Sequence, residues 1–244
     1  MSIHAIPRRA PGVLAGVLER AGAVFAPRRG GTVAVSYGSA AGELAACVSA
    51  TGIADSSQLT KLEIFGPATR LAELIRHATG SVLAPGGVIN AGGAWWCGAG
   101  AASPGLHAQR VVVLCDPSIG FNVHELLTAR GARMAGIAVR DRSLNWGAIT
   151  VIGAATRPVL ASLGVFGPSG DPRDVAPFAS AELAGVEALW LLQSEHRALA
   201  LVPGSVAGTA WRAIERAGQP HRMCCVGQDA IARYELLERR DLFV

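Results

Sequence analysis

The stretch Gly52-Ile-Ala-Asp-Ser-Ser-Gln-Leu-Thr-Lys-Leu-Glu-Ile-Phe-Gly-Pro-Ala68 carries the clearest structural pattern of the chain. The apolar residues of its second half, such as Leu62 and Ile64, favour a half-buried strand. The strand is expected to end at a glycine and then Pro67, because proline suits the first position of a helix. The first half contains small and polar residues, 54–58, which lead to Lys61, the only lysine of the chain. We therefore expect a functional site where this polar segment meets the strand.

The strand–glycine–helix pattern occurs a second time. Residues 62–72 align without a gap to residues 149–159, and the four positions Gly66, Ala68, Thr69 and Arg70 return as Gly153, Ala155, Thr156 and Arg157. Such a repeat predicts an α+β fold made of two similar units, residues 1–140 and 141–244. The alternative is a chance match of short segments rich in glycine and alanine, since only one period is present.

Hydrophobic spacing predicts the other elements. Helices are expected at residues 13–26, 39–48, 68–78, 123–129, 205–217 and 229–238. Strands are expected at residues 32–37, 62–65, 109–115, 149–152, 186–192, 198–202 and 223–226. Two short apolar runs on either side of Gly86-Gly87 predict a hairpin over residues 81–97.

Composition excludes several classes of function. Half of the 244 residues are hydrophobic and 16% are charged, which is typical of a folded chain. The net charge of +4 comes almost entirely from scattered arginines, so a nucleic-acid partner is not expected, and an anionic small molecule fits better. No apolar run reaches the roughly 18 residues of a membrane span and no signal peptide is recognisable, so we expect no membrane partner and a cytoplasmic location.

Metal and disulfide chemistry are not indicated either. The five cysteines include no CxxC pair, so neither a zinc site nor a disulfide framework is predicted. Most of them are expected to be buried, although the neighbours Cys224 and Cys225 cannot both face one core from a strand. The histidines that come into question for a metal lack the spacing of ligands. They are His107, His124, His196 and His221.

Four stretches of the chain resemble the folate-binding aminomethyltransferase family, which includes the glycine cleavage T-protein, its relatives in sarcosine and dimethylglycine oxidases, and folate-binding proteins linked to iron–sulfur enzyme maintenance. They are Val35–Gly38 with Thr51–Pro67, Gly86–Asn90, Val111–Asp116 and Asp141–Gly153. The resemblance implies two α+β units plus a third segment around a central tetrahydrofolate pocket. The family's C-terminal barrel is expected to be absent.

The resemblance also implies roles for particular residues. It places Asn90 where the family has a hairpin aspartate close to the folate nitrogen that accepts the one-carbon unit. A carboxylate there can stabilise positive charge during transfer, whereas an amide can hydrogen-bond but cannot take a proton. Asn90 is therefore the candidate catalytic position, and Glu195 is the only candidate remnant of a pterin-binding glutamate. The residues expected to contact the cofactor are Asp55, Ser57, Lys61, Trp96, Cys115, Glu195 and Arg233.

Most of these residues also have an ordinary structural interpretation. Asp55 can cap a turn, Lys61 can lie at a solvated strand end, and Asn90 can serve the hairpin turn. Only one of the adjacent residues Trp95 and Trp96 can stack on a pterin, because neighbours on a strand face opposite ways.

Arg233 has two interpretations as well. It lies four residues after Asp229 on a predicted helix, a spacing that is typical of a local ion pair. The resemblance suggests instead that it holds the folate carboxylates.

Two functions are compatible with these features. The first is a tetrahydrofolate-binding protein of one-carbon metabolism that accepts or handles a methylene or methyl group from an amine or ether donor, with aminomethyltransferase-like activity if it is an enzyme. It could act as a subunit of a heteromeric oxidase or demethylase, beside a larger flavin oxidase or aminomethyltransferase-like chain. The second is a non-catalytic partner subunit similar to the small gamma subunit of sarcosine oxidase, which the change to Asn90 favours.

Overall fold

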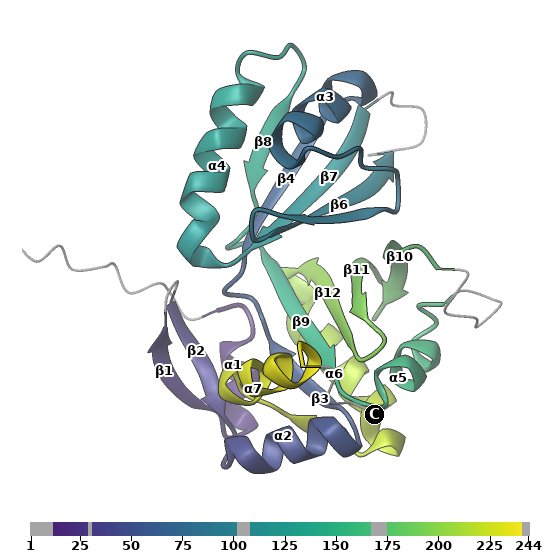
Figure 1. The fold of residues 1–244 in the computed structure, drawn as a ribbon. Coiled ribbons are helices and arrows are strands. Elements are labelled where there is room, and N and C mark those ends of the chain that lie inside the picture. Colours follow the sequence, from purple (N-terminus) through teal and green to yellow (C-terminus); the bar gives the residue numbers. More distant parts are fainter. Residues whose placement is uncertain (1–11, 29–30, 102–107, 167–174, 241–244) are drawn as a thin grey trace, which may run out of the picture.

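The computed structural model describes residues 12–28, 31–101, 108–166 and 175–240, without the side chains of residues 100, 101 and 108. They form two stacked lobes, each built on a mixed or antiparallel sheet with helices (Figure 1). The upper sheet has the strand order β5-β6-β7-β4-β8 and the lower sheet the order β10-β11-β12-β9-β3-β13. A two-stranded ribbon, β1-β2, lies beside the lower lobe (Figure 1). The fold is therefore α+β, as the sequence predicts.

The upper strands are β4 (Thr60–Pro67), β5 (Val88–Ala91), β6 (Ala94–Ala101), β7 (Ala108–Cys115) and β8 (Ala138–Asp141). The lower strands are β3 (Gly52–Asp55), β9 (Trp146–Ile152), β10 (Phe178–Leu183), β11 (Val186–Ser194), β12 (Arg197–Pro203) and β13 (Cys224–Cys225). The ribbon consists of β1 (Val24–Arg28) and β2 (Gly31–Ser36). The helices are α1 (Ala15–Arg20), α2 (Ala40–Ser49), α3 (Ala68–Thr79), α4 (Pro117–Gly131), α5 (Thr156–Ser162), α6 (Ala207–Gly218) and α7 (Gln228–Glu238), with short 3-10 turns at Gly204–Val206 and Gln219–His221.

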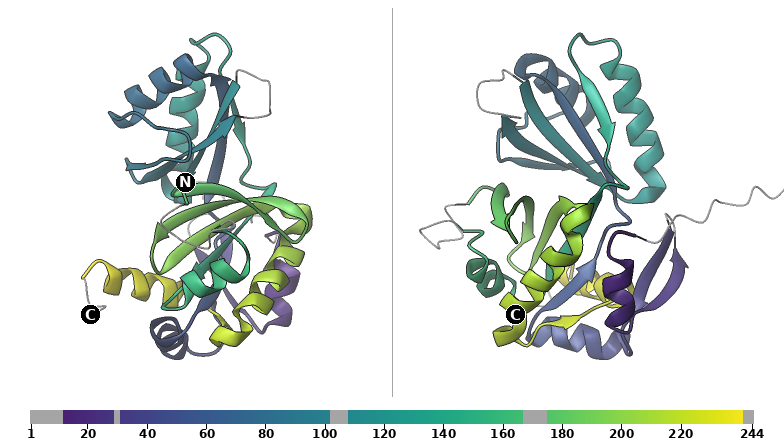
Figure 2. Two further views of the ribbon diagram at one scale, coloured as in Figure 1. Left: turned by 90° about the vertical axis from the view of Figure 1, so that its right-hand side faces the viewer. Right: turned by 180° about the vertical axis from the view of Figure 1, so that it is seen from behind.

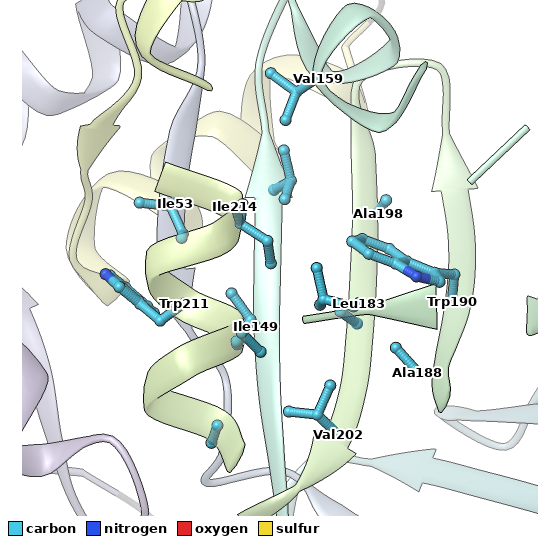
Figure 3. Close-up of a cluster of buried hydrophobic side chains, with 14 of the residues drawn as sticks. Ile53, Ile149, Val159, Leu183, Ala188, Trp190, Ala198, Val202, Trp211 and Ile214 are labelled. Carbon is cyan, nitrogen blue, oxygen red and sulfur yellow. The ribbon is translucent and has the colours of Figure 1, made fainter. Parts of the chain in front are cut away.

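Each sheet is covered by helices on its outer face. In the upper lobe, Leu74 of α3 and Leu127 of α4 are buried in one cluster with Ile64 of β4. In the lower lobe, α6 packs across the sheet, and its residues Trp211 and Ile214 share a second cluster with Ile149, Trp190 and Val202 (Figure 3). Side chains alternate between the two faces of a strand, so the same strands also present an inner face.

The inner faces of the two sheets meet each other. Val112 and Leu114 of the upper sheet pack with Leu199 and Leu201 of the lower sheet in a third cluster. The views from the side and from behind show the upper lobe stacked on the lower sheet at this level (Figure 2).

Part of the lower sheet's inner face is covered by helix α7 instead. Ile231 and Tyr234 of α7 are buried with Ala54 and Ile152, on the side where α2 also packs. The upper sheet and α7 therefore share one face of the lower sheet, and a seam runs between them.

Several predicted elements are confirmed. The helix after the opening strand runs from Ala68 to Thr79 and ends at Gly80. The first residue of the second predicted helix, Ser39, is the N-cap of α2 and accepts a hydrogen bond from the Gly42 N–H. Strands β11 and β12 and helices α6 and α7 lie where hydrophobic spacing predicts them.

Other predictions are wrong in position. The helix expected over residues 13–26 stops at Arg20, and Val24 begins a strand because β-prone residues such as Phe25 pair with β2. The hairpin does not turn at Gly86-Gly87; the strands β5 and β6 are joined by Gly92-Gly93, both in the left-handed region that a tight two-residue turn requires. Asn90 is thus a strand residue opposite Trp95, not a turn residue.

The sheets do not divide the chain at residue 140. Strand β3 belongs to the first expected unit, residues 1–140, yet it pairs antiparallel with β9 in the lower sheet. The upper lobe is instead formed by one continuous segment, from β4 to β8, inserted between β3 and β9. Strands β3 and β9 pair although the whole upper lobe separates them in the chain, so the boundary expected at residue 140 does not separate the two sheets.

No helix among the described residues is both long enough and apolar enough to cross a membrane.

Candidate functional site

A cavity of about 570 Å³ lies at the seam between the upper sheet, the lower sheet and α7. Its wall has four parts, which are assembled from segments that are distant in sequence. The lining residues are Ser56, Gln58, Leu59, Asn90, Gly93, Trp95, Leu114, Cys115, Asp116, Thr150, Gln193, Arg197, Leu199, Gln228, Ile231, Ala232, Glu235 and Arg239.

The upper wall is a row of residues across three strands. Asn90 of β5 lies opposite Trp95 of β6, and Trp95 lies opposite Leu114 of β7. Residues directly opposite in an antiparallel pair project from the same face, so all three side chains point toward the lower sheet. Asp116 follows Leu114 by two residues and extends the row at the start of α4.

The lower wall comes from the inner face of the other sheet. Leu199 of β12 lies opposite Thr150 of β9, and Arg197 precedes Leu199 by two residues on the same face. Gln193 reaches the cavity from the end of β11, close to the irregular pairing between Leu192 and Ser194.

Helix α7 closes the third side. Its cavity residues recur at helical spacing, with Gln228, Ala232, Glu235 and Arg239 on one stripe. The Gln228 side-chain amide donates a 2.7 Å hydrogen bond to the carbonyl of Asp55, which fixes the start of α7 to the end of β3.

The linker between β3 and β4 forms the fourth part of the wall. Ser56 shares a 2.7 Å hydrogen bond with Thr150, so the linker is held against the lower sheet.

The charged side chains of the wall differ in how many ion pairs and hydrogen bonds they form with other residues. Arg197 forms an ion pair with Glu235 and lies 3.6 Å from Glu238. The Asp116 carboxylate accepts one hydrogen bond from the Ser118 N–H through Oδ1. Arg239 is exposed at the cavity edge. The cavity therefore has a carboxylate on its upper wall and a guanidinium on its α7 wall.

The uncharged polar residues of the wall are mostly amides. Four of them line the cavity: Gln58, Asn90, Gln193 and Gln228. An amide both donates and accepts hydrogen bonds, and the indole of Trp95 offers a flat apolar surface. This arrangement suits a planar ligand with hydrogen-bonding edges.

Two of the predicted site residues line this cavity, Asn90 and Cys115. The Cys115 thiol is buried, and burial raises its pKa to about 11, with the neighbouring Asp116 charge acting in the same direction. Cys115 therefore stays protonated at neutral pH and is a poor nucleophile. Asn90 is one of the four amides and has no acid–base function.

Asp55 and Ser57 lie behind the wall and hold the linker. Asp55 Oδ1 accepts a 2.8 Å hydrogen bond from the Ser57 N–H, so the turn-capping interpretation of Asp55 is confirmed. Ser57 Oγ accepts from the Ala148 N–H at 3.0 Å. Burial raises the pKa of the Asp55 carboxyl, while the bonds from Ser57 and the charge of Lys61 oppose the shift.

Lys61 is completely buried, so the expectation of a solvated strand end is wrong. Its ammonium group donates to the carbonyls of Ser57 at 2.7 Å and Leu59 at 2.9 Å. The lysine thus shapes the linker from within and does not line the cavity.

The tryptophan predicted to stack on a ligand, Trp96, does not line the cavity. Trp96 is buried on the outer face of the upper sheet, among α3 and α4 residues, and its indole N–H donates to the Ala91 carbonyl at 3.3 Å. Trp95 lines the cavity instead. Strand alternation shows that only one can do so, but the sequence does not indicate which sheet face points inward.

Glu195 and Arg233 also lie away from the cavity. Glu195 is exposed and pairs with Arg157 at 3.0 Å. Arg233 is exposed on the far side of α7, and Asp229 pairs with Arg28 at 3.0 Å, so the expected local pair of Asp229 with Arg233 is wrong.

The cavity residues that the sequence did not indicate are mainly Asp116, Gln193 and Arg239. Strand alternation places position 116 on the same face as Leu114, and helical spacing places position 239 on the same stripe as Gln228, but neither pattern says that the face or the stripe lines a cavity. Gln193 depends on a strand irregularity that has no sequence signal.

The described residues contain no group of histidine, cysteine and acidic side chains that could hold a metal ion. His107 falls outside them. All five cysteines are thiols; Cys47, Cys97 and Cys115 are buried, and Cys224 and Cys225 are half-buried.

Comparison with known proteins places this fold. No family model matches the chain, and no curated protein matches it in sequence. In structure it is similar to the glycine cleavage system aminomethyltransferase T of Bartonella henselae, with a TM-score of 0.69 and 16% identity over 89% of this chain. It is also similar to a chain of the heterotetrameric sarcosine oxidase of Corynebacterium sp. U-96, with a TM-score of 0.54 and 20% identity over 75% of this chain.

The two comparisons differ in length. The chain spans 59% of the aminomethyltransferase and 92% of the sarcosine oxidase chain. The class of protein is thus an α+β chain with the fold of aminomethyltransferase T. The expected likeness to the T-protein and to sarcosine oxidase is confirmed at the level of the fold.

Proposed function

We propose that this chain binds tetrahydrofolate in the cavity between its two sheets and α7, and that it serves one-carbon metabolism. The observation that carries the proposal is the composition of the cavity wall: one indole face and four amides around about 570 Å³, in the fold of an aminomethyltransferase. Pockets for small ligands commonly measure about 300–1,000 Å³.

The wall is chemically suited to a reduced folate. The pterin ring can stack on Trp95, and its alternating N–H and carbonyl groups can pair with amides such as Gln193 and Gln228. The glutamate carboxylates of folate require a cation, which Arg239 supplies at the cavity edge. The site would handle a methylene or methyl group from an amine or ether donor; Asn90 can orient such a group but cannot exchange a proton with it.

The direct test is calorimetric titration of the purified chain with tetrahydrofolate under reducing conditions. A cavity-filling variant, Ala232→Trp, should abolish binding, because residue 232 lines the cavity and is exposed enough to accept a larger side chain. The matched control is Arg233→Trp, one residue further on the opposite side of the helix, which should bind like the wild type. Binding that survives Ala232→Trp contradicts the assignment to this cavity.

The cation can be tested in the same way. Arg239→Ala should weaken tetrahydrofolate binding about tenfold, the usual value of one charge-assisted hydrogen bond, whereas Arg233→Ala should leave it unchanged. The reverse result would return the role to Arg233, as the sequence suggested.

A second function is favoured by a separate observation. The chain covers 92% of a chain that belongs to a heterotetramer, which supports a role as a partner subunit. The amide of Asn90, which cannot exchange a proton, favours a subunit that has lost the folate chemistry. The partner would be a larger flavin oxidase or an aminomethyltransferase-like chain, and a cytoplasmic location remains a prediction. Native purification followed by mass measurement distinguishes the cases, since a subunit emerges with a stoichiometric partner chain of that kind and does not bind tetrahydrofolate.

A further inference from the structure

The cavity wall carries negative charge. Among the lining residues two carry a carboxylate, Glu235 and Asp116. Glu235 already has a partner, because it forms an ion pair with Arg197 of the lower wall. Asp116 uses Oδ1 for the Ser118 N–H, and within the described parts of the chain its other oxygen has no hydrogen-bonding or ionic partner. Asp116, which is exposed at the cavity wall, is therefore the carboxylate of the wall that has an oxygen left for a ligand.

The position of Asp116 relative to Asn90 follows from the strand register. Ala94 lies opposite Cys115, so the turn Gly92-Gly93 ends beside the start of α4. A side-chain carbon placed on Gly93 would lie 3.2 Å from Ile119 in the first turn of that helix. The hairpin that carries Asn90 thus packs directly beside Asp116. One part of the wall presents a neutral amide and the adjacent part a carboxylate.

We infer that Asp116 binds the amino-substituted edge of the ligand, and that the cavity selects a planar heterocycle with paired N–H donors on this side. The second oxygen of Asp116 has no partner among the described residues and Oδ1 has one further lone pair, so the carboxylate can accept two N–H groups, and it forms stronger hydrogen bonds with them than an amide does. Arg239 on the α7 wall provides the opposite charge, so the ligand is oriented with its amino edge toward the upper sheet and any carboxylate toward α7. The identity of this ligand as a folate rests on the proposed function; the selection for paired N–H donors does not.

A purely structural role for Asp116 makes a different prediction. As the N-cap of α4 it can be replaced by asparagine with little loss, because the two residues cap helices about equally well. Asp116→Asn therefore keeps the fold and removes only the charge. The chain offers a matched control in Asp141, an exposed aspartate whose Oδ1 accepts from the Ser143 N–H at 2.7 Å in the same type of turn. Asp141 does not line the cavity.

The test compares two ligands on the wild type, Asp116→Asn and Asp141→Asn. The ligands are tetrahydrofolate, measured by calorimetry, and 2-aminopyrimidin-4-one, a small heterocycle with the same paired donors, measured by NMR titration. Asp116→Asn should weaken both at least tenfold while the melting temperature stays within a few degrees, and Asp141→Asn should change neither.

The outcomes separate the two proposals. Wild type that binds the pyrimidinone but not tetrahydrofolate, with Asp116→Asn losing the pyrimidinone, overturns the folate assignment and supports the inference. Unchanged binding in Asp116→Asn, or an equal loss in Asp141→Asn, overturns the inference and leaves folate binding intact. Wild type that binds neither ligand overturns both.

Discussion

The two strand–glycine–helix segments, residues 62–72 and 149–159, are alike in sequence but differ in what their inner faces contact. In the upper lobe, β4 passes through Gly66 into α3; in the lower lobe, β9 passes through Gly153 into α5. Both strands have a hydrogen-bonded neighbour on each side, and both helices pack on outer faces. The repeated residues therefore belong to the layers that the two lobes share.

The inner faces of the two segments have diverged. Glu63 of β4 aligns with Thr150 of β9 in the repeat. Glu63 is buried and pairs with Arg142 at 2.7 Å and with Arg110 at 3.7 Å. Thr150 bonds Ser56 and faces the cavity. Equivalent positions thus serve an internal charge network in one lobe and a binding surface in the other.

The largest expected difference between the segments lies at their glycines. Gly153 has a φ of 123°, and a side-chain carbon there would lie 2.4 Å from the Cys47 carbonyl oxygen, so Gly153→Ala should destabilise the chain by about 3 kcal/mol or more. Gly66 does not have a positive φ, and its nearest obstacle is the flexible end of Ile137, so Gly66→Ala should cost about 1–2 kcal/mol. Urea unfolding of both variants measures the difference. Equal losses would mean that the two glycines serve one common purpose.

The next largest loss of stability is expected at Glu63, the member of the aligned pair Glu63 and Thr150 that belongs to the charge network. Glu63→Gln leaves the guanidinium groups of Arg110 and Arg142 without their carboxylate, and the expected loss of stability is about 2 kcal/mol, because Arg142 can still reach water. Urea unfolding at low and moderate salt provides the measurement. A neutral substitution would show that the network does not stabilise the upper lobe.

A smaller loss of stability is expected at Thr150, the residue that aligns with Glu63. Thr150→Val removes the hydroxyl that bonds Ser56 and should cost about 1 kcal/mol, since the Ser56 hydroxyl is left buried. Thermal unfolding of Thr150→Val and Glu63→Gln in parallel ranks the two sites. A larger loss for Thr150→Val would reverse the comparison and make the cavity wall the more rigid side.

The smallest expected effect is a gain of stability in Asp55→Asn, and it depends on pH. Burial raises the pKa of Asp55, so the folded state favours the protonated form, and the contribution of this group to stability is present in acid and lost as the pH rises through the raised pKa. Asp55→Asn should therefore be more stable than the wild type at pH 7, and the gain should vanish below the ordinary aspartate value of 3.8. Guanidinium unfolding of both proteins from pH 3 to pH 7 checks this. A gain that is the same at every pH would rule out the burial of charge as its cause.

Much of the fold could be predicted from local patterns. Apolar spacing located α2, α3, α6 and α7, and the alternation of strands with helices gave the α+β class. Strand β3 was missed because its four residues, Gly52–Asp55, are stabilised by pairing with β9 and not by their own preference. The insertion of the upper lobe between β3 and β9 was missed for the same reason.

The candidate site was predictable only in part. Asn90 and Cys115 line the cavity, although the Cys115 side chain packs in the same outer cluster as Trp96, and Lys61 is completely buried. The sequence pattern restricts the choice between Trp95 and Trp96 to one residue, and the direction depends on which face of the upper sheet meets the lower sheet. Arg239 and Glu235 belong to the site because α7 packs on Ala54 and Ile152, far from it in the chain.

By itself, the sequence determined the local conformations and the repeated building block, because capping, strand alternation and helical spacing act between residues a few positions apart. Only the tertiary structure decided which of those residues share a cavity. That decision depends on which faces of the two sheets and α7 are buried against one another, and burial is a property of surfaces formed by distant segments. The polar stretch from Asp55 to Lys61 illustrates both: its turn follows from its own residues, while its place in the cavity wall follows from its contacts with Thr150 and Gln228.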